Sequence, residues 1–210
     1  MQRRQIFAMA PLAALTATFG MALATSLVPA TAFAQTKDTK DTKEIKIAHI
    51  YSKTGPLEAY GKQTATGFMM GLDYATGGTM TVAGKKLVII EKDDQGKPDL
   101  GKSLLASAYS DDKADMAVGP TSSGMALAML PVAEEYKKIL LVEPAVADSI
   151  TGEKWNKYIF RTGRNSSQDA ISNGVAVDKE GTSIATLAQD YAFGRDGVKA
   201  FKARILLFVF

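Results

Sequence analysis

Short apolar runs alternate with stretches of helical periodicity along most of this sequence, and that alternation limits the folds available to it. Four runs have the length of buried strands, at residues 45–51, 87–90, 116–118 and 139–142. Three stretches between them have apolar residues at helical spacing, at residues 57–72, 98–109 and 124–136. Strands that alternate with helices form a parallel sheet with helices on both faces. The sequence therefore predicts the α/β class.

Beyond residue 160 the alternation begins again, which indicates the start of a second α/β unit. We expect a helix over residues 167–180, a strand over 182–187, a loop at 191–194 and a further helix that begins near Val198. Residues 205–210 are all apolar, a pattern that a surface helix does not show. We therefore expect a truncated chain, the result of a frameshift near Arg204.

The first 34 residues are typical of a secretory signal peptide, which predicts a periplasmic protein. Arg3 and Arg4 precede an uncharged run over residues 6–34, and this run ends in Ala32-Phe33-Ala34. An uncleaved membrane anchor is the alternative, and the glycine and two prolines within the run argue against it. The arginine pair also permits twin-arginine export. Residues 35–44 repeat Thr, Lys and Asp without a core-forming side chain, so we expect a disordered tether there.

The composition excludes several kinds of chemistry. The chain has no cysteine and one histidine, so neither a thiolate metal site, a thiol nucleophile nor a disulfide framework is expected. The formal net charge of +3 is too small to indicate a nucleic-acid partner. The histidine, His49, lies between apolar neighbours of the first strand and is expected in the core or at its rim. Asp93 and Asp94 end the second strand, where a solvated turn explains them.

One stretch matches a nucleotide-binding pattern. Residues 96–103 fit the phosphate-binding motif G-x-x-x-x-G-K-[ST] and lie between a strand and a helix. We expect Pro98 to begin the helix, because proline fits the first helical turn. Gly101 and Lys102 would then lie inside that helix, with no loop left to surround a phosphate. We therefore predict no cofactor.

Three loops are expected to meet at the carboxyl ends of the strands, where parallel sheets bind ligands. They cover residues 52–56, 119–124 and 143–148. The middle loop leads directly into a helix, and its hydroxyl groups followed by free backbone N–H groups would suit an anion such as a carboxylate. Helix capping by Ser122 or Ser123 is favoured over an anion site by the sequence alone, and both can hold at once.

An ordered set of short motifs over about residues 44–204 resembles the periplasmic solute-binding proteins for branched-chain amino acids. The motifs are the first strand with its Thr-Gly-Pro turn, Tyr60-Gly61, Asp93-Asp94 with Pro98, Val118-Gly119-Pro120 with the two serines, Glu143-Pro144-Ala145, Phe160-Arg161-Thr162, and residues 190–194. The resemblance implies two α/β lobes joined by a hinge. Residues 45–163 would form the ligand-binding lobe, 164–181 a crossing helix, and 182–210 the start of a truncated second lobe.

The same resemblance implies function. Such proteins are not enzymes; they close on leucine, isoleucine, valine or a related small carboxylate and deliver it to the permease subunits of an ABC transporter. The missing remainder of the second lobe implies that this chain binds its ligand poorly. A ligand-sensing domain of a receptor and an exported nucleotide-binding enzyme remain the alternatives.

The resemblance also implies roles for individual residues of this sequence. By resemblance, Ser122 or Ser123 and the nearby N–H groups would hold the ligand carboxylate. Ala145 and Ala147 would offer backbone groups, Tyr60 would wall the side-chain pocket, and Phe193, with Tyr191 as the second choice, would close over the ligand from the second lobe. Amino-acid binders of the family tend to have a hydroxyl residue where Ala147 stands. Its absence favours an aromatic or aliphatic carboxylate over a ligand with an α-ammonium group.

Overall fold

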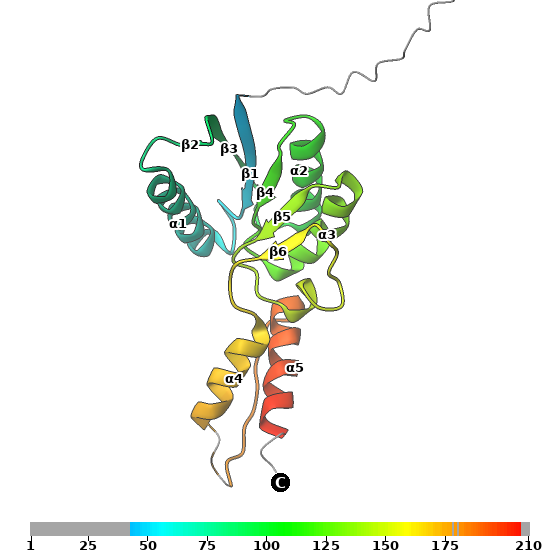
Figure 1. The fold of residues 1–210 in the computed structure, drawn as a ribbon. Coiled ribbons are helices and arrows are strands. Elements are labelled where there is room, and N and C mark those ends of the chain that lie inside the picture. The colour runs from blue at the N-terminus through cyan, green and yellow to red at the C-terminus, as the bar shows by residue number, and fades with distance from the viewer. Residues whose placement is uncertain (1–42, 178, 180, 207–210) are drawn as a thin grey trace, which may run out of the picture. The chain divides into compact units, whose positions relative to one another are not determined.

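The computed structural model describes residues 43–177, 179 and 181–206 (Figure 1). The predicted signal peptide and nearly all of the predicted tether lie outside the described residues. None of the described helices is both long and apolar enough to cross a membrane.

The order of elements confirms the predicted α/β alternation. It runs β1 (Glu44–Tyr51), α1 (Glu58–Thr76), β2 (Thr81–Val82), β3 (Lys85–Asp93), α2 (Pro98–Ser110), β4 (Met116–Val118), α3 (Ser123–Tyr136), β5 (Ile139–Val142), the 3-10 turn η1 (Asp148–Ile150), β6 (Ile159–Arg161), α4 (Ser166–Val177) and α5 (Ala192–Leu206). All four predicted core strands are present. β6 was not predicted as a strand; unlike the three apolar residues of β4, its three residues include the charged Arg161.

The strands form one sheet in the order β2-β3-β1-β4-β5-β6. β1 is parallel to both β3 and β4, and β5 is parallel to β4 and β6, while β2 and β3 form an antiparallel hairpin. The chain moves from β1 to β3 on one side and then crosses back to β4 on the other. The strand order therefore reverses at β1, the position where ligands bind in sheets of this kind.

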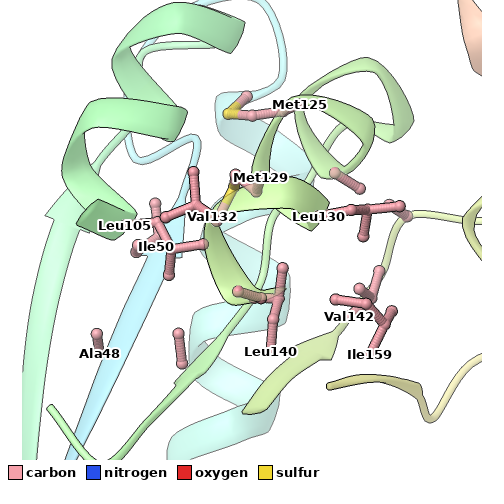
Figure 2. Close-up of a cluster of buried hydrophobic side chains, with 14 of the residues drawn as sticks. Ala48, Ile50, Leu105, Met125, Met129, Leu130, Val132, Leu140, Val142 and Ile159 are labelled. Carbon is pink, nitrogen blue, oxygen red and sulfur yellow. The ribbon is translucent and has the colours of Figure 1, made fainter. Parts of the chain in front are cut away.

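The largest cluster of buried side chains lies between the sheet and helices α2 and α3 (Figure 2). Ile50 of β1, Leu105 of α2, Met129 of α3 and Leu140 of β5 are all completely buried there. Gly101 allows α2 and α3 to approach closely, since a Cβ atom at this position would lie 2.7 Å from the Met125 side chain. Gly101 therefore serves helix packing, and Gly101 and Lys102 lie inside α2, as predicted.

His49 lies in the core, as predicted. Its ring stacks on Tyr51 at 4.4 Å and lies 4.7 Å from Phe68 of α1. Neither ring nitrogen has a hydrogen-bond partner among the described residues. Burial lowers the pKa of His49 from 6.5 to about 4, and the Glu91 carboxylate offsets part of that effect. The imidazole is therefore neutral at physiological pH.

Two predictions for the segment after β6 were wrong. Residues 182–189 form no strand and are exposed, because within the described residues no other strand lies beside them to accept their hydrogen bonds. The predicted loop at 191–194 is instead the start of α5, which begins at Ala192 rather than near Val198. Gly194 suggested a loop, but its role is packing: a Cβ atom there would lie 2.1 Å from the Gln189 carbonyl oxygen. α5 also continues into the apolar run as far as Leu206.

Candidate ligand-binding site

The three loops at the carboxyl ends of the strands meet, as predicted, and hydrogen bonds join them. The Ser52 N–H donates to Thr121 Oγ1 at 3.1 Å, which links the first loop to the second. The Glu143 N–H donates to the Gly119 carbonyl at 3.4 Å, which links the third loop to the second. The site is therefore built on three neighbouring strand ends of one sheet.

Gly119 allows the second loop to pass directly over β1. Its φ of +124° lies in a region that residues with a Cβ atom rarely adopt. A Cβ atom at this position would also lie 1.9 Å from the Ile50 carbonyl oxygen. Both observations require glycine here, and the close passage places the following serines beside the end of β1.

Ser123 joins the second loop to the third instead of capping its helix. Its Oγ accepts hydrogen bonds from the N–H groups of Val146 at 3.2 Å and Ala147 at 3.1 Å, and the side chain is buried. With these two bonds accepted, the hydroxyl group retains its own proton to donate. No acceptor for that proton lies among the described residues.

The first turn of α3 has no cap, so the capping interpretation was wrong. Ser122 occupies the N-cap position, but its half-buried side chain makes no capping hydrogen bond. The first bond of the helix runs from the Ala126 N–H to the Ser122 carbonyl at 2.9 Å. Among the described residues, the N–H groups of Ser123, Gly124 and Met125 have no acceptor. Unpaired N–H groups at the positive end of a helix dipole can bind an anion.

Ala145 and Ala147 are both buried, yet they differ in what they can offer a ligand. The Ala147 N–H is bonded to Ser123, and its carbonyl accepts hydrogen bonds from Arg161 Nη1 at 2.8 Å and from the Ile150 N–H at 3.2 Å. The backbone groups of Ala145 make no hydrogen bond with any described residue. Of the two alanines, Ala145 is the one with backbone groups left to bind a ligand.

One aromatic side chain, Tyr191, approaches the first turn of α3, and Tyr60 lies near Tyr191. Tyr60 on α1 is 64% exposed. The Tyr191 ring approaches Gly124 so closely that a Cβ atom there would be 3.5 Å from Cδ2. Burial raises the pKa of Tyr191, and the nearby Tyr60 adds to that effect. Phe193 lies 6.0 Å from the Tyr191 ring and lines a cavity of about 750 Å³ along α4 and α5. The structure therefore places Tyr191, rather than Phe193, against Gly124 in the first turn of α3.

A buried carboxylate that the sequence did not reveal, Asp94, lies behind the site. Asp94 was interpreted as part of a solvated turn, but its side chain is completely buried. Its Oδ1 accepts hydrogen bonds from Ser52 Oγ at 2.7 Å and from the Gly96 N–H at 2.9 Å. Burial raises the pKa of Asp94. Asp94 holds Ser52, and Ser52 in turn holds Thr121, so this carboxylate fixes the first two loops. A pair of residues 42 positions apart gives no local signal in the sequence.

The described residues contain no cluster of side chains that could hold a metal ion. What they do contain is a lobe whose strand-end loops surround hydrogen-bond donors with no partners. This arrangement is typical of α/β domains that bind small solutes at the carboxyl ends of parallel strands.

Comparisons with known proteins agree with this class. Residues 44–205 match the family model described as periplasmic binding protein. The chain is 28% identical over 165 residues to the Leu/Ile/Val-binding protein BraC3 of Rhizobium johnstonii, which covers 77% of this chain and 44% of BraC3. This chain belongs to the periplasmic binding protein family.

Two solved structures from Rhodopseudomonas palustris are similar to this chain. One, an ABC-type branched-chain amino acid transporter, is 72% identical with a TM-score of 0.68, over 78% of this chain and 44% of that one. Another is a solute-binding protein of an ABC transporter in complex with 3,4-dihydroxybenzoic acid. It is 34% identical with a TM-score of 0.72, over 79% of this chain and 45% of that one. The chain spans somewhat less than half the length of these relatives.

Proposed function

We propose that this chain is the extracytoplasmic solute-binding component of an ABC importer and that it captures a small carboxylate. Membership of the periplasmic binding protein family supports the role in transport. The candidate ligands are branched-chain amino acids and aromatic carboxylates, since relatives include Leu/Ile/Val-binding proteins and proteins in complex with benzoate or hydroxybenzoates. Its partners would be the permease subunits, and an N-terminal signal peptide would direct it to the periplasm.

The unpaired first turn of α3 is the observation that supports this proposal most strongly. The N–H groups of Ser123, Gly124 and Met125, together with the Ser122 and Ser123 hydroxyl groups, form a cluster made mostly of donors. Such a cluster suits a carboxylate, which only accepts hydrogen bonds. Tyr60 and Tyr191 would then contact the remainder of the ligand.

An aromatic or aliphatic carboxylate fits the described residues better than an amino acid. The Ala147 carbonyl, one of the backbone acceptors nearest this turn, is already occupied by Arg161 and Ile150. Ala147 also has no hydroxyl group to offer an α-ammonium group. Of these two alanine carbonyls, only that of Ala145 could accept from a cationic group on the ligand, and each ammonium proton left unpaired would weaken binding.

Isothermal titration of the 210-residue chain with benzoate, benzamide and leucine tests this proposal. Benzamide has the shape of benzoate but lacks its charge, so we expect binding of benzoate only. Ser122→Ala should weaken benzoate binding about tenfold, because a hydrogen bond to a charged group is lost. Ser103→Ala, an exposed serine of α2, serves as the matched control. Equal affinity for benzamide and benzoate would refute a carboxylate site at α3.

A further inference from the structure

The loop after β5 is tied to both helices that follow the sheet by aspartate–serine pairs. Asp148 accepts hydrogen bonds from the Ser167 N–H at 3.0 Å and from Ser167 Oγ at 2.6 Å, at the start of α4. The next residue, Ser149, donates its N–H at 2.9 Å and its Oγ–H at 2.8 Å to Oδ2 of Asp196 on α5. The second pair joins residues 47 positions apart, so it connects α5 directly to the loop after β5.

Asp196 and Tyr191 lie on the same rigid segment. The Arg195 N–H donates to the Tyr191 carbonyl at 3.0 Å, so the helical hydrogen bonds of α5 begin at Tyr191 itself. Residues five positions apart on a helix differ by about 7.5 Å along its axis and keep a constant relation to each other. Whatever holds Asp196 in place therefore also holds the Tyr191 ring, which lies against Gly124 in the first turn of α3.

We propose that Asp196 is a positioning residue for ligand binding. By holding Ser149, it keeps Tyr191 over the unpaired N–H groups of α3, where the ligand carboxylate binds. The inference rests on the proposed function, since it assigns the first turn of α3 as the ligand site. Asp196 itself does not contact the ligand; it acts through α5.

A second aspartate close to Asp196 provides a matched control. Asp190 forms an ion pair with Arg195 at 2.8 Å, in which the side chains are 91% and 68% exposed. Removal of either aspartate changes the net charge of this segment equally. Only Asp196, however, is bonded to a residue of the loop after β5.

Amide hydrogen exchange without ligand tests whether Asp196 fixes α5. In Asp196→Ala we expect amides of residues 190–206 to exchange about fivefold faster or more, because the tie to Ser149 is gone. Amides of residues 116–142 should exchange as in the wild type. Asp190→Ala should behave as the wild type, and Asp196→Asn should restore protection, because its side-chain oxygen can still accept both hydrogen bonds.

Ser149→Ala keeps the test decisive if Asp196→Ala disturbs the whole fold. It removes only the hydroxyl bond and leaves the N–H bond, so it should accelerate exchange in α5 by a smaller factor. Combined with Asp196→Ala, it should add nothing further, because both changes remove the same contact. Wild-type exchange of α5 in Asp196→Ala, or full additivity in the double variant, would overturn the proposal.

Titration with benzoate tests the consequence for binding. We expect Asp196→Ala to weaken binding about tenfold and to do so mainly through faster dissociation, while Asp190→Ala leaves affinity unchanged. Unchanged affinity in Asp196→Ala, with α5 loosened, would overturn the role in binding. If the wild type binds no carboxylate, the proposed function fails, and the exchange data still show whether Asp196 fixes α5.

Discussion

The sheet-containing segment from β1 to β6 and the helical segment from α4 to α5 are held together by different kinds of interaction. The first has a continuous apolar core between the sheet and helices α2 and α3. In the second, Val175 is 62% exposed and Leu187 is fully exposed, and α5 is tied to the 3-10 turn η1 by the polar pair of Ser149 and Asp196. Helices acquire stable positions by burying an apolar face, so the second segment depends far more on individual hydrogen bonds.

The largest difference between the two segments should appear when a large apolar side chain is removed. Met129→Ala leaves a cavity in the buried core and should lower the free energy of unfolding by about 4 kcal/mol. Phe201→Ala, in the half-buried face of α5, should cost about 1 kcal/mol or less. Urea denaturation followed by circular dichroism measures both values. Equal losses would mean that α5 shares the core of the sheet.

Acid should destabilise the sheet-containing segment through His49. Its pKa is about 4 in the folded chain and 6.5 when unfolded, so between these values only the unfolded chain gains a proton. The free energy of unfolding should therefore fall by about 3 kcal/mol as the pH falls from 7 to 4. Burial raises the pKa of Asp94, which acts in the opposite direction, because the folded chain then binds that proton more readily than the unfolded chain as the pH falls.

His49→Phe isolates the histidine contribution, because Asp94 is unchanged in that variant. The phenyl ring can keep the stacking between Tyr51 and Phe68. Urea denaturation at several pH values should show that the decrease below pH 6.5 is smaller in the variant by about 3 kcal/mol. The same pH dependence in both proteins would exclude His49 as its cause.

The buried carboxylate of Asp94 should stabilise the fold because its oxygen atom accepts hydrogen bonds, not because it is charged. Asp94→Ala leaves Ser52 and the Gly96 N–H without an acceptor and should cost about 2 kcal/mol. Asp94→Asn keeps an acceptor at the same place and should cost about 1 kcal/mol or less. Thermal unfolding at pH 7 distinguishes the two. An Asn variant as unstable as the Ala variant would show that the negative charge itself is needed.

The smallest effect is expected from the ion pair of Asp190 and Arg195 at the start of α5. Exposed pairs contribute little, because water screens the charges and both side chains lose conformational freedom. Thermal unfolding of Asp190→Ala should match that of the wild type. A clear loss of stability would mean that the helical segment depends on surface charge as well as on the Ser149 contact.

The main strands and helices up to Val142 could be predicted from the sequence because each is defined by neighbours only a few positions away. Short apolar runs identified β1, β4 and β5, and Pro98 correctly marked the start of α2. The meeting of the three loops followed from the geometry of parallel sheets. The predictions for residues 182–194 failed because a strand requires a partner and because Gly194 serves a packing contact that local pattern does not reveal.

The candidate ligand site also has features that the sequence predicted and features that only the tertiary structure shows. The residues from Gly119 to Gly124 predicted hydroxyl groups directly before a helix, and this prediction needed only neighbouring residues. Only the tertiary structure shows that Ser123 holds the third loop and that Ser122 does not cap the helix. It also shows that Asp94 is buried. Hydrogen bonds and burial of this kind join residues tens of positions apart. Their identity depends on how the strands are ordered in the sheet, and no short stretch of sequence contains that order.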